Sequence, residues 1–183
     1  MADVIYKAAT EFISSDPTGN RYDVLIAMES PDRKGDVILN SAWRLDNFLK
    51  NPVLLWAHDR TIPPIGRING LELTSDGLVG EMEFAATPFA QEIKGLYDDQ
   101  FIRGVSVGFL PLKSELGRPI PGRGGQRGYR YLEAELLEVS CVPIPMHADT
   151  LIRRALEDTS YSPAVSQLMT DLIYIGENIG KVL

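Results

Sequence analysis

The sequence predicts a mainly β fold of the α+β class, in which a few helices accompany the strands. Short apolar or alternating segments recur along the chain between clusters of turn-forming residues, a pattern typical of strands. One pair of such segments is joined by residues 74–77, Thr-Ser-Asp-Gly, which is a strong hairpin signal. Helical spacing of apolar residues is confined to a few stretches.

The N-terminal part is expected to supply three strands and a helix. Residues 3–12 and 22–28 are predicted to be strands joined by a segment rich in turn-forming residues. Aromatic and leucine residues at helical spacing predict a helix over 42–50, which an Asn-Pro pair ends. Val53–Trp56 is an unbroken apolar run, so we expect a buried strand with His58 just after its end.

The middle of the chain is expected to form the hairpin, a helix and a strand that carries a serine. Residues 67–73 and 78–84 are the two arms of the hairpin, and the second alternates apolar residues with glutamates. A threonine cap followed by proline begins a predicted helix over 87–99. Residues 104–109, Gly-Val-Ser-Val-Gly-Phe, then predict a half-buried strand with Ser106 at its centre.

The last part contains a polar segment, a long strand and a helical tail. Residues 113–128 hold glycines, prolines and four basic residues, so we expect a mobile loop that is solvated or that contacts a substrate, a phosphate or an acidic partner. Residues 129–143 predict a strand in which Glu138 lies on an apolar side and needs a partner. Residues 163–181 have the spacing of an amphipathic helix, which closes the core or pairs with a second copy.

Composition limits the classes of function. A length of 183 residues fits one domain with a short appendage, and no apolar run approaches the ~20 residues that a membrane helix needs. The start of the chain shows no secretory signal pattern. The net charge of −7 argues against general nucleic-acid binding. Cys141 is the only cysteine, which excludes an intramolecular disulfide.

Three polar residues near the ends of apolar strands suggest nucleophilic catalysis. A serine hydroxyl is a weak nucleophile until a neighbouring base takes its proton. In a small barrel distant strand ends can converge, so His58 could take the proton of Ser106 while Glu138 holds the imidazole. On its position alone, His58 could equally be a structural histidine bound to a carbonyl.

Other interpretations of the same residues remain open. The order Ser106, Glu138, His147 also fits an α/β-hydrolase, although a proline-containing segment follows the serine where a helix is required. A metal site could use His58, Asp59 and His147, but the helical metal-binding spacing is absent. A scaffold module that keeps these residues without the activity is the non-enzymatic alternative.

Three segments, in this order, resemble the prohead maturation proteases of tailed bacteriophages. They are NPVLLWAHDRTIPPIGRI, GVSVGF and LLEVSCVPIPMHADTLI, and the likeness spans residues 20–155. That family is similar to the herpesvirus assemblins, which are β-barrel serine proteases. The resemblance implies an assemblin-like antiparallel β-barrel with a few surrounding helices over residues 1–156, followed by a helical tail over 157–183.

The resemblance also implies an activity and its residues. Ser106 would be the nucleophile, His58 the base and Glu138 the third member of the triad, with no cofactor and no metal. The family cleaves scaffold and capsid precursor proteins inside the assembling prohead, in the host cytoplasm, and often cleaves itself. By analogy with the assemblins we expect a homodimer formed through residues 163–181, and neither nucleic acid nor membrane as a direct partner.

Overall fold

The structure is a computed structural model that describes residues 5–9, 11–14, 20–144 and 146. These residues belong to one compact unit of the chain. The predicted tail over 157–183, its helix over 163–181 and its part in a dimer lie outside the described residues.

The described residues form one sheet of ten strands, one α-helix and two short 3-10 helices. In chain order the elements are β1 (Ile5–Ala9), β2 (Glu11–Ser14), β3 (Arg21–Ala27), β4 (Val37–Ile38), η1 (Asn40–Ala42), β5 (Trp43–Arg44), η2 (Phe48–Lys50), β6 (Val53–Trp56), β7 (Gly66–Leu73), β8 (Leu78–Phe84), α1 (Pro88–Asp98), β9 (Gly104–Pro119) and β10 (Arg127–Val142).

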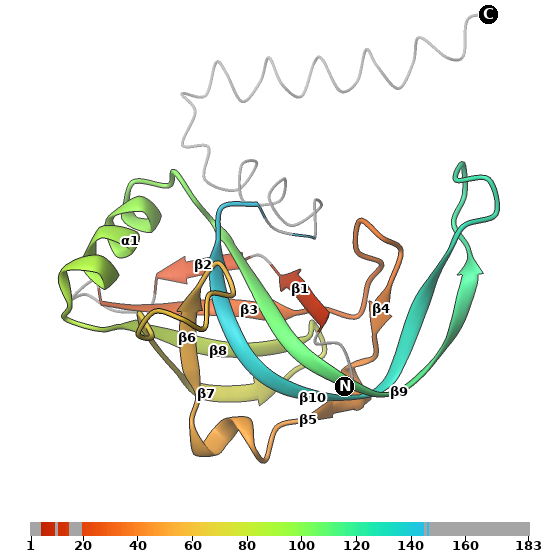
Figure 1. Cartoon of the computed structure of the whole chain (residues 1–183), viewed down its shortest axis with the longest axis horizontal. Helices are drawn as coiled ribbons and strands as arrows, with labels where there is room; N and C mark the ends of the chain where they lie inside the picture. The colour runs from red at the N-terminus through yellow and green to blue at the C-terminus, as the bar shows by residue number, and fades with distance from the viewer. Residues whose placement is uncertain (1–4, 10, 15–19, 145, 147–183) are drawn as a thin grey trace, which may run out of the picture. The chain divides into compact units, whose positions relative to one another are not determined.

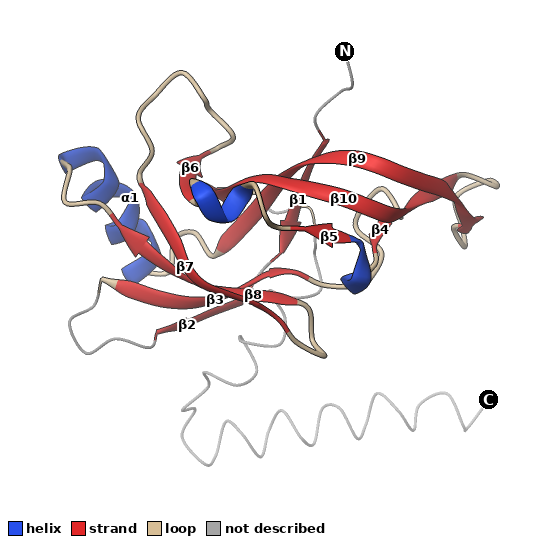
Figure 2. Cartoon of the chain, turned by 90° about the horizontal axis from the view of Figure 1, so that it is seen from below, coloured by secondary structure: helices blue, strands red, loops and turns tan. Residues whose placement is uncertain are grey.

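The sheet curls into a nearly closed barrel. Its strand order is β1-β9-β10-β6-β7-β8-β3-β2, and the short strands β4 and β5 add to β10. The curl brings β3 against β9, so that six strands, from β9 through β10, β6, β7 and β8 to β3, surround the core (Figures 1 and 2). This confirms the predicted mainly β, barrel-like fold. Most pairs are antiparallel, but β10 runs parallel to β4, β5 and β6, so the sheet is mixed.

Two long strands, β9 and β10, run side by side through the molecule. Each is 16 residues long, and their outer ends project past the barrel as a twisted hairpin, which we call the arm (residues 113–130; Figure 1). The prediction of a mobile loop over 113–128 is therefore wrong for most of that range. The strands continue to Pro119 and resume at Arg127, and only residues 120–126 connect them.

Helix α1 begins as predicted and is attached to the strand of Ser106. The Thr87 hydroxyl accepts a hydrogen bond from the Ala90 amide at 3.4 Å, which caps the first turn. The buried side chains of Ile93 and Tyr97 join the core, and the Tyr97 hydroxyl donates to the carbonyl of Gly104 at 2.5 Å. The helix therefore fixes the point at which β9 begins, and Figure 1 shows the chain passing from α1 through a short loop into that strand.

The predicted helix over 42–50 is wrong. Residues 43–44 form the short strand β5, which pairs with β10 through Trp43 and Ala134. The buried Trp43 ring packs edge-on against Phe109, with centroids 6.1 Å apart. This packing in the core outweighs the helical spacing of the segment, because local propensity is a weak determinant beside tertiary contacts.

Candidate active site

A sharp reversal of the chain after β6 positions His58. Because β6 runs parallel to β10, a straight continuation would carry His58 past Cys141. Instead Ala57 and His58 adopt left-handed backbone conformations, with φ of 50° and 61°. The Ala57 amide donates to the carbonyl of Cys141 at 2.8 Å, which anchors the turn to β10. Two successive non-glycine residues in this region are strained, and such strain is frequent at functional sites.

The reversal brings the imidazole of His58 to the carboxylate of Glu138. Nδ1 of His58 lies 2.7 Å from Oε1 of Glu138, although the two residues are 80 positions apart. The Glu138 residue is only 2% exposed, so its charge is shielded from water. Glu138 thus has the partner that its place on the apolar side of the strand requires.

Ser140 connects the same two residues and was not identified from the sequence. Its hydroxyl donates to Oε2 of Glu138 at 2.6 Å and accepts a hydrogen bond from the backbone amide of His58 at 3.2 Å. The residue is fully buried. A signal was available in the sequence, because residues i and i+2 of a strand share a face. A serine two positions after a buried glutamate is therefore a candidate hydrogen-bond donor to it.

The register of β9 and β10 places Ser106 on the face that holds this pair. Ser106 lies directly opposite Ser140, and Gly108 lies opposite Glu138. Side chains at directly opposite positions are neighbours, with Cβ atoms about 4.5–5.5 Å apart. Ser106, His58 and Glu138 come from three separate parts of the chain, and the fold gathers them at one face of these two strands.

Gly108 leaves the space that the Glu138 carboxylate occupies. A Cβ atom at position 108 would lie 2.2 Å from Oε1 of Glu138, far inside van der Waals contact. The second glycine of the Gly-Val-Ser-Val-Gly segment is thus explained by the close approach of this side chain.

The α/β-hydrolase alternative does not fit the fold. That architecture needs a helix directly after the nucleophile, whereas β9 continues as a strand from Ser106 to Pro119. Glu138 contacts His58, and His147 lies outside the described residues. Across the described ranges we find no group of three or more His, Cys, Asp or Glu residues arranged to hold a metal ion. In the same ranges no helix has the length and apolar character to cross a membrane.

The site has the chemistry of a proton-transfer centre. A carboxylate at Nδ1 fixes the tautomer of an imidazole and leaves Nε2 to exchange a proton with a hydroxyl. The His58 side chain is 19% exposed and the Glu138 side chain 3%, so the imidazole is accessible from outside while its carboxylate is enclosed.

A family model described as caudovirus prohead serine protease matches residues 20–162. The chain belongs to this family of phage peptidases.

Two curated relatives support the assignment to the prohead proteases. The chain is 33% identical over 130 residues to the prohead protease of Escherichia phage T5, a match covering 69% of this chain and 58% of the relative. It is 29% identical over 131 residues to the capsid polyprotein of Pseudomonas phage PAJU2, which covers 67% of this chain and 18% of the polyprotein. The chain thus spans less than two thirds of the length of either relative.

A solved structure of similar fold also comes from a phage. The bacteriophage T4 capsid assembly protease, gp21, aligns with a TM-score of 0.54 at 14% identity, over 78% of this chain and 98% of that structure. At this identity the match shows a shared fold. The chain therefore shares the fold of that structure over most of its length.

Proposed function

We propose that this chain is a serine endopeptidase in which Ser106 is the nucleophile, His58 the general base and Glu138 the orienting carboxylate. The single observation that carries the proposal is the buried contact of 2.7 Å between Nδ1 of His58 and Oε1 of Glu138. The register of the two strands also supports it. Ser106 lies opposite Ser140, and Ser140 is hydrogen-bonded to both His58 and Glu138.

The three residues would divide the reaction as in other serine proteases. His58 takes the hydroxyl proton of Ser106 as the oxygen attacks a peptide carbonyl, and Glu138 stabilises the imidazolium. The imidazolium then protonates the departing amine, the C–N bond breaks, and an acyl-enzyme remains on Ser106. A water molecule, deprotonated by His58, hydrolyses the ester and restores the hydroxyl.

We infer that the substrates are scaffold and capsid precursor polypeptides, and that the chain also cleaves itself. The matches to a prohead protease and to a capsid polyprotein support this substrate class. The site of action would be the interior of the assembling prohead in the host cytoplasm, where those precursors are concentrated.

The test compares the wild-type chain with Ser106→Ala on a capsid precursor. Mass spectrometry should detect precursor cleavage by the wild-type chain and none by the variant. Ser106 is buried, but the change removes a single oxygen atom and leaves no large cavity, so the free energy of unfolding should change by less than about 1 kcal/mol. A variant that fails to fold would instead give Ser106 a structural role.

A fluorophosphonate probe separates the protease from a non-catalytic capsid-assembly module with the same fold. An activated serine hydroxyl reacts covalently with such a probe, whereas an ordinary serine does not. Labelling of Ser106 in the wild-type chain, and its loss in His58→Ala, is the expected result. A folded wild-type chain that takes up no label would favour the assembly module.

We also propose that the chain forms a homodimer through residues 163–181. The amphipathic spacing of this segment and the late dimer helix of the assemblins support the proposal. Sedimentation of the full chain over a range of concentrations should show a monomer–dimer equilibrium. A monomer at every concentration would contradict it.

A further inference from the structure

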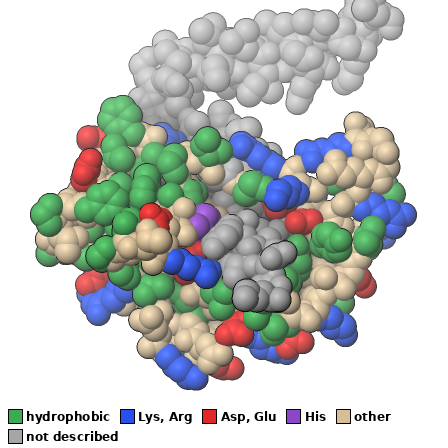
Figure 3. All heavy atoms as spheres, in the orientation of Figure 1, with side chains coloured by type: hydrophobic (Ala, Val, Ile, Leu, Met, Phe, Trp, Pro, Cys, Tyr) green, Lys and Arg blue, Asp and Glu red, His purple; other side chains and the backbone are tan. Residues whose placement is uncertain are grey.

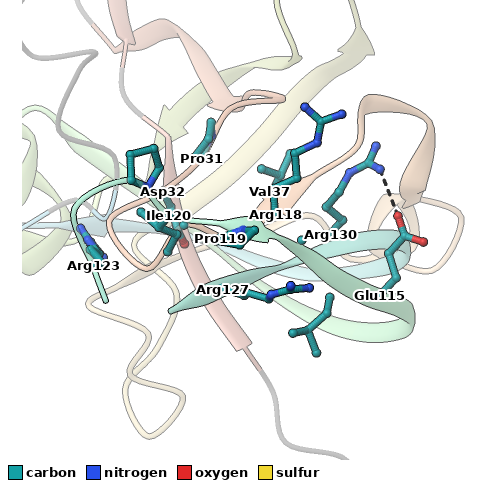
Figure 4. Close-up of a pocket in the computed structure, with 14 residues that line it drawn as sticks. Pro31, Asp32, Val37, Glu115, Arg118, Pro119, Ile120, Arg123, Arg127 and Arg130 are labelled. Carbon is teal, nitrogen blue, oxygen red and sulfur yellow. Dashed lines mark hydrogen bonds and ion pairs between the residues drawn. The ribbon is translucent and has the colours of Figure 1, made fainter. Parts of the chain in front are cut away.

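A groove lies where the arm meets the loop before β4, away from the residues assigned to catalysis. It has a volume of about 970 Å³ and is lined by residues 115–121 of the arm, by three further arginines, and by Pro31, Asp32, Gly35 and Val37. We call it the arm groove. In Figure 4 the Arg130–Glu115 ion pair lies at one end and Arg123 at the other, with Asp32 and Ile120 between them.

Close backbone contacts hold the two walls of the arm groove together. A Cβ atom at Gly128 would lie 1.8 Å from the carbonyl oxygen of Gly35, so the arm and the loop touch where both residues are glycine. The Asp36 carboxylate accepts a hydrogen bond from the Tyr129 amide at 2.7 Å, and Asp32 accepts from the amides of Lys34 and Asp36. The walls are therefore fixed before any ligand arrives, which lowers the entropic cost of binding.

The lining of the arm groove carries an excess of positive charge. Four arginines line it, against the two acids Asp32 and Glu115. Arg130 is engaged with Glu115 at 3.0 Å, and Arg123 donates to the carbonyl of Arg33 at 2.5 Å. Within the described ranges, Arg118 and Arg127 have neither an ion pair nor a side-chain hydrogen bond. Both residues are exposed and line the arm groove, and a guanidinium group can bind a carboxylate in bidentate geometry.

The positive charge belongs to the arm and not to the whole molecule. The chain carries a net charge of −7. The arm nevertheless holds five basic residues against the single acid Glu115, and Figure 3 shows blue side chains on the side of the view where the arm projects, while hydrophobic side chains predominate over the opposite side. Such a local basic patch on an acidic protein favours a partner whose negative charge is confined to a short segment.

The remaining lining is apolar. The apolar side chains that line the arm groove are those of Pro31, Val37, Leu116, Pro119, Ile120 and Pro121. A ligand that fills the arm groove must therefore combine carboxylates with apolar groups, as a polypeptide segment with interspersed acidic and aliphatic residues does. A nucleic-acid backbone offers closely spaced phosphates but no aliphatic side chains to fill this apolar lining, so it matches the arm groove less well than such a polypeptide.

We propose that the arm groove binds an acidic polypeptide segment of a partner protein, through Arg118 and Arg127. The same two strands carry Ser106 and Glu138 at their other ends, about 40 Å away along an extended strand of twelve residues. A polypeptide held in the arm groove is thereby tethered to the two strands that carry the triad, at a distance from it. Binding itself does not require the triad, so the proposal stands or falls separately from the protease assignment.

The test measures binding without cleavage, using the full chain with Ser106→Ala. The probe is a fluorescein-labelled peptide of twelve residues that alternates glutamate with leucine or alanine, followed by fluorescence anisotropy. Replacement of every glutamate by glutamine should weaken binding at least tenfold. Arg118→Glu and Arg127→Glu should each weaken it about tenfold, and together they should abolish it. Lys50→Glu, an exposed residue outside the arm groove with the same change of charge, should leave affinity within twofold.

Each contrary result overturns the proposal. Equal weakening by Lys50→Glu and by the arginine variants would indicate general charge attraction only. Equal affinity for the glutamine peptide would remove the role of the carboxylates. A single-stranded oligonucleotide of equal charge that binds more tightly than the peptide would make the groove a nucleic-acid site. Absence of peptide binding by a folded chain would leave it without this function.

Discussion

At the scale of single residues, the Glu138 carboxylate is held by contacts on both of its oxygens. Oε1 lies within hydrogen-bond distance of Nδ1 of His58, and Oε2 accepts a hydrogen bond from the hydroxyl of Ser140. The Ser140 hydroxyl also accepts a hydrogen bond from the backbone amide of His58. One buried hydroxyl therefore holds both the carboxylate and the strained turn. We infer that Ser140 is a positioning residue, because it acts on the reaction through Glu138 and His58.

Ser140→Ala should lower kcat about tenfold and leave KM nearly unchanged. The variant removes a buried hydrogen bond to a charged group, which also costs about 1–3 kcal/mol of stability. Steady-state kinetics on a precursor peptide and chemical denaturation measure the two effects. Ser114→Ala, an exposed serine on β9, is the control that should change neither. A Ser140→Ala enzyme with less stability but full kcat would limit Ser140 to a structural role.

Gly108→Ala should inactivate the enzyme by displacing the Glu138 carboxylate. The added methyl group would overlap Oε1, so the contact with His58 cannot persist in its present geometry. We expect kcat to fall at least tenfold in a chain that remains folded by circular dichroism. Gly95→Ala is the matched control, because a Cβ there meets nothing within 4 Å, and in helix α1 the change should add about 1 kcal/mol of stability. Full activity of Gly108→Ala would contradict this account of the glycine.

At the scale of elements, β10 is the strand around which the site is assembled. It pairs with β9 along its whole length and with β4, β5 and β6 along its other edge. One face of its inner end presents Glu138 and Ser140 to the site. Cys141, the next residue, is completely buried.

Because Cys141 is buried, the free energy of unfolding should fall as the pH rises into the alkaline range. Burial raises the pKa of its thiol to about 12, from the ordinary value of 9.0 in the unfolded chain. The folded state thus favours the neutral thiol. That contribution is complete below pH 9 and is lost as the pH rises from 9 towards 12.

Denaturant titrations at pH 8 and pH 10 measure this contribution. Between these two values the wild-type chain should lose about 1.4 kcal/mol more stability than Cys141→Ala, which has no thiol to ionise. Parallel loss in the two chains would mean that other groups, such as the buried tyrosines, account for the whole effect.

Elements whose signals are local could be predicted from the sequence. The capped helix at Thr87, the hairpin at residues 74–77 and the apolar strand 53–56 each depend on neighbouring residues alone, and all three are confirmed. The segment 3–12 was predicted as a single strand. Its described residues instead divide between β1, which pairs with β9, and β2, which pairs with β3. Which distant strand each half of the segment pairs with is not visible in the local residue pattern, so the division could not be predicted.

At the scale of the whole molecule, the family could be predicted because its three motifs keep their order along the chain. The nearness of His58 to Glu138 needed the fold, since it depends on the parallel pairing of β6 with β10 and on the reversal at Ala57. The arm groove was missed for the same reason, because its two walls come from parts of the chain that are far apart in the sequence. The hydrogen bond from Ser140 to Glu138 is different, since the spacing of two residues on one strand already places both side chains on the same face.

The position of β10 late in the chain has a consequence for synthesis. A nascent polypeptide that has left the ribosome only as far as residue 137 already holds His58 and Ser106, but not Glu138, the proposed orienting acid. Closure of the sheet by this strand is a slow, non-local folding event. The proposed peptidase activity would therefore arise only after translation has passed residue 138 and the barrel has formed.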